Sequence, residues 1–208
     1  MIRNILFDFG GVIIDIDPPS VIYELMKMGV TKGLELHQHL SGHDAYVRLE
    51  KNELSPDEFR GLIRSFTGLP LTDAQIDHAW NTIIKDIPEP RMELIKRLRK
   101  KYGVYLLSNT NAIHYDYYNL YIKKNFGFER LDDVFDRAWY SFQMGLFKPD
   151  PEIFRRVLAE GNLVAEETVF IDDNEDNVSA AEKVGLKGYH LKKGEDVVGI
   201  FEDGRLKI

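Results

Sequence analysis

The stretch that decides the fold is Ile5-Leu6-Phe7-Asp8-Phe9-Gly10-Gly11-Val12-Ile13-Ile14-Asp15, at the start of the 208-residue chain. The three apolar residues at positions 5 to 7 predict a strand buried on both faces, which is typical of a parallel sheet. The strand runs into Asp8, and the glycine pair lets the backbone turn sharply and approach a ligand closely. An Asp at a strand end is more often only a cap or turn residue, so its meaning depends on the rest of the chain.

From Pro90 onward, predicted strands and helices alternate. We expect helix 91–102, strand 104–108, helix 112–124, strand 134–140, helix 151–161, strand 168–171 and helix 175–184. This alternation predicts an α/β fold, in which a parallel sheet carries α-helices on both faces and the crossovers are right-handed. Ligands bind such sheets at the carboxyl ends of the strands. Asp8, Ser108 and the Asp172-Asp173 pair all fall at that edge.

Residues 18–87 carry helix signals without a strand signal. Pro18-Pro19 predicts the start of a helix that Gly29 ends. Two capping boxes, Ser55 to Glu58 and Thr72 to Gln75, predict the starts of two further helices. The sequence therefore predicts a core made of residues 1–17 and 88–208, with a helical cap, residues 18–87, inserted after the first strand.

Composition limits the partners and the compartment. The net charge of −7 disfavours a nucleic acid as the main partner. Because cysteine is absent, there is neither a disulfide framework nor a thiol nucleophile. No segment is long and apolar enough to span a membrane, and Asp8 with its glycines interrupts the first apolar run where a secretory signal would be continuous. We therefore expect a cytoplasmic protein without a membrane partner.

Four chemically distinct elements converge on the predicted sheet edge: Asp8; Ser108-Asn109-Thr110; Lys148; and Asp172-Asp173 with Asn177. Clustered carboxylates repel each other and need a cation, and oxygen-only ligands favour Mg²⁺. Lys148 can neutralise a phosphate, and Ser108 with the backbone N–H groups that open the next helix can cradle it. A phosphate held there can be attacked by Asp8, giving an aspartyl-phosphate.

These residues match, in order and approximate spacing, the four motifs of the haloacid-dehalogenase superfamily, over essentially the whole chain. Within it, Asp8-Phe9-Gly10-Gly11-Val12, Ser108-Asn109-Thr110-Asn111 and Asp172-Asp173-Asn174 resemble a subgroup with bacterial α-D-glucose-1-phosphate phosphatases. The resemblance implies a Rossmann-like core and a Mg²⁺ cofactor. It implies the nucleophile Asp8; phosphate contacts from Ser108, Asn109 and Lys148; metal contacts from Asp8, Asp173 and the Gly10 carbonyl; and support for the metal site from Asp172 and Asn177.

One position departs from the family pattern. Phosphatases of this superfamily usually carry a second Asp two residues after the nucleophile, as general acid and base, and here that position is Gly10. General acid–base help is worth about 10²–10⁴-fold in rate. Without it, acidic leaving groups are favoured, which predicts a preference for sugar 1-phosphates. If another residue gives the proton, Asp15, Asp17 or a cap histidine is the first to consider.

The sequence thus predicts a Mg²⁺-dependent phosphatase of small phosphorylated metabolites, most of all sugar phosphates. One alternative is a metal-independent 2-haloacid dehalogenase, which also lacks the acid because halide leaves without a proton; the Asp172-Asp173 pair argues against it. The other is a non-catalytic metabolite-binding protein, which would not need the whole constellation. A cap cluster of His37, His39 and His43 resembles a metal site, but its spacing does not place all three on one helical face.

Overall fold

The computed structural model describes residues 1–202 and 205–207, so the last residue of the predicted core, Ile208, lies outside the described part. The main sheet contains five parallel strands in the order β3-β2-β1-β4-β5. Their bounds are β1 Asn4–Phe7, β2 Gly103–Ser108, β3 Arg137–Tyr140, β4 Thr168–Asp172 and β5 Lys187–His190. The first strand is central, so the residue that follows it lies in the middle of the sheet's carboxyl edge.

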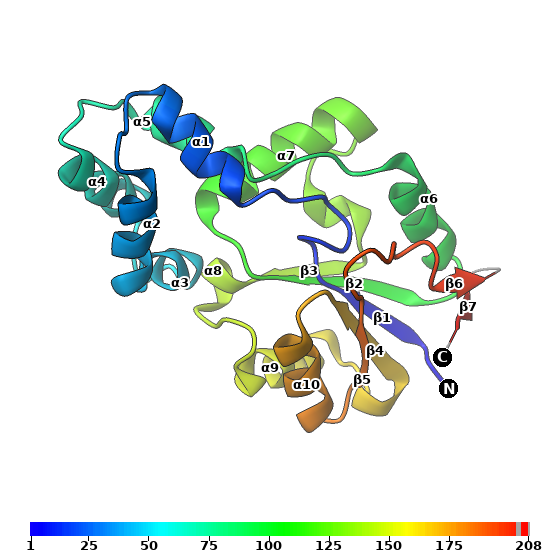
Figure 1. Cartoon of the computed structure of the whole chain (residues 1–208). Coiled ribbons are helices and arrows are strands. Elements are labelled where there is room, and N and C mark those ends of the chain that lie inside the picture. Colours follow the sequence, from blue (N-terminus) through cyan, green and yellow to red (C-terminus); the bar gives the residue numbers. More distant parts are fainter. Residues whose placement is uncertain (203–204, 208) are drawn as a thin grey trace.

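Helices cover both faces of this sheet (Figure 1). One face carries α6 (Glu89–Leu98) and α7 (Ala112–Phe126), and the other carries α9 (Pro151–Gly161) and α10 (Glu175–Lys183). Along β1, Ile5 and Phe7 pack into the first layer and Leu6 into the second, because successive strand residues point to opposite faces. The predicted Rossmann-like α/β fold is confirmed.

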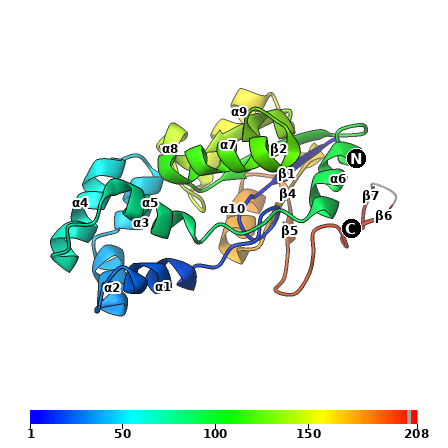
Figure 2. The same cartoon turned by 90° about the horizontal axis from the view of Figure 1, so that it is seen from above.

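Five helices lie together at one end of the sheet, in both Figure 1 and Figure 2. They are α1 (Pro19–Lys27), α2 (Gly33–Gly42), α3 (Ala45–Glu50), α4 (Pro56–Thr67) and α5 (Asp73–Asn81). They share an apolar cluster of their own, which includes Leu36, Phe59 and Ile76. Both predicted capping boxes are formed, at Ser55 and Thr72. We call this group of helices the cap.

Two linkers join the cap to the core and run side by side. The backbone N–H of Asp15 donates to the Asp86 carbonyl, and the N–H of Lys85 donates to the Asp15 carbonyl. Further along, the N–H of Asp17 donates to the Ile83 carbonyl, and Ile16 and Ile84 form an antiparallel bridge. The outgoing and returning chain therefore make a short two-stranded ribbon.

Some element boundaries differ from those that the sequence predicts. The strand expected over 134–140 begins later, at Arg137, because Leu131–Val134 forms a 3₁₀ turn (η1) that buries Leu131 and Val134. The helix expected over 91–102 starts earlier and ends at Leu98. Short elements without a sequence prediction are the edge strand β5 of the main sheet, α8 (Ser141–Met144), η2 (Ala165–Glu167), and the antiparallel pair β6 (Phe201–Glu202) and β7 (Arg205–Leu206). Within the described ranges, every helix is too short or too polar to cross a membrane.

Candidate active site

Three carboxylates meet at the carboxyl edge of the sheet. Asp8 follows β1, Asp172 ends β4, and Asp173 follows it. One oxygen from each of the three lies within 4.8 Å of one oxygen from each of the others. They come together because β1 and β4 are hydrogen-bonded neighbours in register, with Phe7 opposite Ile171. The prediction that these strand ends converge is therefore met by the geometry.

Lys148 is the positive partner of this cluster. Its Nζ lies 2.6 Å from Asp8 Oδ1 and 2.8 Å from Asp172 Oδ2, and it also donates to the Leu107 carbonyl at 3.0 Å. The side chain is 1% exposed, so these contacts replace water. Burial alone lowers the pKa of Lys148, but the two carboxylates more than offset that and hold it above its usual value. The ammonium is therefore a fixed positive charge beside Asp8 and Asp172.

Asn109 positions the segment that carries Lys148. Its Nδ2 donates to the Lys148 carbonyl at 3.0 Å, and its Oδ1 accepts from the Lys148 N–H at 2.9 Å. Both ends of the Asn109 side-chain amide are thus hydrogen-bonded to the backbone of Lys148. Ser108 ends β2 beside them and is buried. The next N–H, that of Thr110, donates to Ser141 Oγ, so it is not free for a phosphate.

Asp172 and Asp173 have different surroundings. Asp172 is fully buried, and besides Lys148 it accepts from the Asn174 N–H at 2.8 Å and from Asn177 Nδ2 at 3.0 Å. Asp173 is exposed, and partial burial together with Asp172 raises its pKa. The Asp172 carboxylate is therefore fixed by hydrogen bonds from Lys148, Asn174 and Asn177, whereas the Asp173 side chain is accessible to a ligand.

The glycine pair has two different structural roles. Gly11 has φ +75°, and a Cβ atom there would lie 2.4 Å from Asp173 Oδ2, so only glycine permits this approach. Gly10 does not need positive φ, and a Cβ atom there would meet only Ile16 carbons at 3.6 Å or more, which is ordinary contact. Residue 10 could therefore carry a side chain, and its lack of a carboxylate is not a steric necessity.

The donor set fits a divalent cation. Three carboxylates face one ammonium in this cluster, so negative charge is in excess, and burial raises the pKa of Asp8 to about 7 against the opposing effect of Lys148. The repulsion between the carboxylates in such a site is reduced either by a bound proton or by a cation that binds the carboxylate oxygen atoms. Oxygen-only ligands suit Mg²⁺.

The residues that the sequence suggests as proton donors contact side chains outside the cluster at Asp8. Asp15 Oδ1 is 2.8 Å from Arg91 Nη1, and Asp17 lies 3.5 Å from Lys85. In the cap, the His39 and His43 rings contact each other at 4.6 Å, and His37 Nδ1 lies 3.0 Å from the Tyr46 hydroxyl. Among the described residues, the only cluster able to hold a metal through three or more carboxylate, imidazole or thiolate groups is the one at Asp8.

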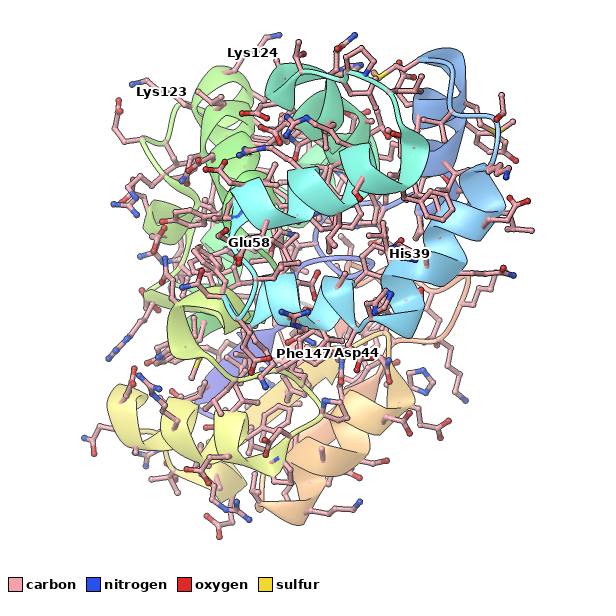
Figure 3. All side chains as sticks on the ribbon, turned by 90° about the vertical axis from the view of Figure 1, so that its left-hand side faces the viewer. His39, Asp44, Glu58, Lys123, Lys124 and Phe147 are labelled. Atoms are coloured by element: carbon pink, nitrogen blue, oxygen red, sulfur yellow. The ribbon has the colours of Figure 1, made fainter. Side chains whose placement is uncertain are left out.

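Sequence reasoning missed one acidic residue that interacts electrostatically with this site. Glu50 ends cap helix α3, and the charges of both Lys148 and Asp8 reach its carboxyl group. Figure 3, viewed from the cap side, shows the cap helices in front of the sheet, with Asp44 at the start of α3 and Phe147 beside the Lys148 segment. No motif in the linear sequence marks Glu50, because its position depends on how the cap docks.

The model of the haloacid dehalogenase-like hydrolases matches residues 2–185. The chain belongs to that family. It is therefore a haloacid dehalogenase-like hydrolase, as the resemblance of its motifs implied. The segments that carry this resemblance are the ones that meet around Asp8.

Relatives of this hydrolase have assigned activities or solved structures. The D-ribitol-5-phosphate phosphatase of Bacteroides thetaiotaomicron is 33% identical over 94% of this chain and 95% of its own. A crystal structure of a haloacid dehalogenase-like family enzyme from the same organism, in complex with magnesium and inorganic phosphate, superposes with a TM-score of 0.87 at 39% identity, over 97% of this chain and 100% of that one. The L-2-haloacid dehalogenase of Xanthobacter autotrophicus, with a TM-score of 0.62 at 19% identity over 92% and 78%, shares the fold alone.

Proposed function

We propose that this hydrolase is a Mg²⁺-dependent phosphatase that acts on small phosphorylated sugars or sugar alcohols through an aspartyl-phosphate on Asp8. The observation that carries the proposal is the Asp8 carboxylate beside Lys148 Nζ at 2.6 Å, with Asp172 and Asp173 alongside. A related enzyme crystallised with magnesium and phosphate, and another named as a phosphatase, support it.

The chain's own groups would perform two displacements. An oxygen of Asp8 attacks phosphorus, the ester oxygen departs as the P–O bond breaks, and water then attacks the phosphorus of the aspartyl-phosphate to release phosphate. Lys148 favours the ionised form of Asp8 against the effect of burial, and it neutralises charge on the transferring phosphoryl group. Ser108 and the Asn109 N–H bind its remaining oxygens. A bound Mg²⁺ supplies further electrostatic stabilisation of the phosphoryl oxygens.

The metal would be held by Asp8, Asp173 and the backbone carbonyl of Gly10. Asp172 and Asn177 keep this arrangement in place rather than binding the metal directly, since both oxygens of Asp172 are already hydrogen-bonded. The cap, residues 18–87, is proposed to act as a separate unit that closes over this edge and excludes water.

The nature of the substrate depends on the leaving oxygen. If no residue protonates it, the glycine at position 10 favours sugar 1-phosphates, whose anomeric hydroxyl is a more acidic leaving group than a primary alcohol. If a residue does protonate it, phosphates of primary alcohols, such as the one named for the ribitol-phosphate relative, are equally accessible. A sugar 1-phosphate and its 6-phosphate isomer, compared by kcat/KM, separate the two cases.

The experiment that tests the proposal measures phosphate release and halide release side by side. We expect the wild type to release phosphate, EDTA to abolish this release, and Mg²⁺ to restore it. The Asp8→Asn variant should release no phosphate, although its circular dichroism spectrum matches that of the wild type. Halide release from a 2-haloacid that persists in EDTA would instead establish the dehalogenase alternative. Ligand binding without either product would establish the metabolite-binding one.

A further inference from the structure

We propose that Glu50 of the cap is the proton donor to the leaving oxygen, and that it takes over the acid–base role for which residue 10 has no side chain. This inference rests on the proposed function. It concerns a residue on a different element and a different domain from the nucleophile, and it follows from four observations on Glu50 and its neighbours.

The first observation is where α3 sits. This short cap helix, Ala45–Glu50, contacts α8 (Ser141–Met144), which follows β3 on the core. Glu50 is the last residue of α3 and is only partly exposed. Ser141 of α8 is hydrogen-bonded to both the N–H and the carbonyl of Thr110, so α3 packs beside the segment that also carries Ser108 and Asn109.

The second observation is electrostatic contact with the reacting groups. The charges of Lys148 and Asp8 both act on Glu50, the first lowering its pKa and the second raising it. The negative charges of Glu50 and Asp8 both raise the pKa of the Tyr118 hydroxyl on α7. Glu50 is therefore close enough to Lys148, Asp8 and Tyr118 to interact with them electrostatically. The proposal places the leaving oxygen between Glu50 and Asp8, on the side of phosphorus opposite to the attacking carboxylate.

The third observation is that the carboxyl group of Glu50 is not engaged in a structural interaction within the described residues. Among the described residues, its carboxyl group makes neither a hydrogen bond nor an ion pair, unlike Glu58 and Glu53 nearby, which bond to Ser55 and Lys51. Burial raises the pKa of Glu50 to about 7. A carboxyl group that keeps its proton near neutral pH and has no partner is suited to give that proton away.

The fourth observation is the need for a proton. An alkoxide leaving from phosphorus is a poor leaving group unless its oxygen is protonated as the P–O bond breaks. The alternatives named above are engaged, Asp15 with Arg91 and Asp17 with Lys85. Of the acidic groups considered, Glu50 interacts electrostatically with Asp8 and has a carboxyl group without a hydrogen-bond or ion-pair partner among the described residues.

The proton balance closes over the two steps. In the first, Asp8 bonds to phosphorus, the P–O bond to the substrate breaks, and the proton of Glu50 passes to the departing oxygen. In the second, the Glu50 carboxylate takes a proton from the water that attacks phosphorus, and the bond from phosphorus to Asp8 breaks. Glu50 is protonated again, and the net reaction is ester plus water to alcohol plus phosphate.

The test uses Glu50→Gln with esters of two kinds. An alkyl phosphate needs the proton, whereas an aryl phosphate with an acidic phenol leaves without it. We expect kcat/KM for the alkyl phosphate to fall by about 10²-fold or more, and that for the aryl phosphate by much less. A burst of phenol should then precede slow turnover of the aryl ester, because the second step also lacks its base.

Two further variants sharpen the result. Glu53→Gln removes a cap carboxylate that is ion-paired to Lys51, and we expect both esters to be hydrolysed as by the wild type. Gly10→Asp combined with Glu50→Gln places a carboxyl group where a side chain has room, and we expect it to restore hydrolysis of the alkyl ester. A merely structural role of Glu50 does not produce such a rescue.

Equal losses on both esters in Glu50→Gln, or no loss on either, would overturn the inference. These outcomes differ from failure of the proposed function itself. If Asp8→Asn still turns over, or if no phosphate is released by the wild type, the phosphatase proposal fails. If Asp8→Asn is inactive while Glu50→Gln treats both esters alike, only the assignment of Glu50 fails.

Discussion

The imidazole of His114 stacks on the indole of Trp80, with ring centroids 5.1 Å apart and planes inclined by 10°. His114 belongs to core helix α7 and Trp80 to cap helix α5, so the stack joins the two parts of the molecule. The His114 Nδ1 donates to Asn81 Oδ1 at 2.9 Å, and burial lowers the pKa of His114 from 6.5 to about 3. The ring is therefore neutral in the folded protein.

This neutral histidine predicts loss of stability in acid. Below pH 6.5 the unfolded chain binds a proton at His114 that the folded protein does not, so the free energy of unfolding falls as the pH falls toward 3. We expect the stability of the wild type relative to His114→Gln to fall by up to about 1.4 kcal/mol per pH unit in this range. Urea unfolding at a series of pH values measures it.

Only the difference between the two proteins isolates His114. Burial raises the pKa of Asp8 and of Glu50, and this acts in the opposite direction, since the folded protein then binds protons that the unfolded chain does not. Those contributions are present in both proteins and cancel in the difference. A difference that stays constant from pH 4 to 8 would contradict the prediction.

Removing the Lys148 ammonium should destabilise the protein as well as inactivate it. In Lys148→Met, Asp8 and Asp172 lose their shared buried partner, and breaking such a pair costs about 3–5 kcal/mol. The loss should be smaller at pH 5 than at pH 7.5, because protonation of Asp8 relieves the unpaired charge. The control is Lys96→Met, whose exposed ion pair with Glu93 should cost about 0–1 kcal/mol. Chemical unfolding of the metal-free proteins measures both.

Metal binding should be visible as stabilisation, independently of turnover. At a Mg²⁺ concentration 100 times the dissociation constant, the folded protein gains about 2.7 kcal/mol, which thermal unfolding with and without EDTA detects. Asp173→Asn should lose this gain, yet be no less stable than the wild type in EDTA, because one of three neighbouring negative charges is gone. Asp176→Asn on the exposed start of α10 should keep the Mg²⁺ effect. An undiminished effect in Asp173→Asn would exclude that residue as a ligand.

Gly11→Ala should be more damaging than its backbone conformation alone explains. A side chain at φ +75° costs about 1–3 kcal/mol, and the added Cβ would also displace the Asp173 carboxylate. Gly68→Ala is the matched control, because Gly68 has φ +67° but no atom within 4 Å of the added Cβ. We expect Gly11→Ala to lose more stability than Gly68→Ala and also to weaken Mg²⁺ binding. Similar losses in both variants, with Mg²⁺ binding intact, would contradict the close approach.

The meeting of Asp8 and Asp172 could be predicted because it depends on regular structure. The apolar residues before Asp8 and Asp172 define strands, and parallel strands bring their carboxyl ends to one edge. The capping boxes at Ser55 and Thr72 could be predicted because they depend on residues three apart in the chain.

The position of Glu50 could not be predicted in this way. The six-residue helix that it ends is too short for a clear periodic pattern, and its approach to Asp8 depends on how the cap packs on the core. The engagement of the Asn109 amide by the Lys148 backbone was equally hidden, because it joins segments 39 residues apart. Tertiary packing, rather than local sequence, determines the surroundings of these two residues.

The paired linkers at Asp15 to Asp17 and Ile83 to Asp86 restrict how the cap can move. Two strands cross-linked by backbone hydrogen bonds bend readily out of their common plane, but resist bending within it, because one strand would have to stretch against the other. The cap would therefore rotate relative to the core about the two linkers, along a single arc. Each closure would then return Glu50 to the same position relative to the carboxyl edge of the sheet.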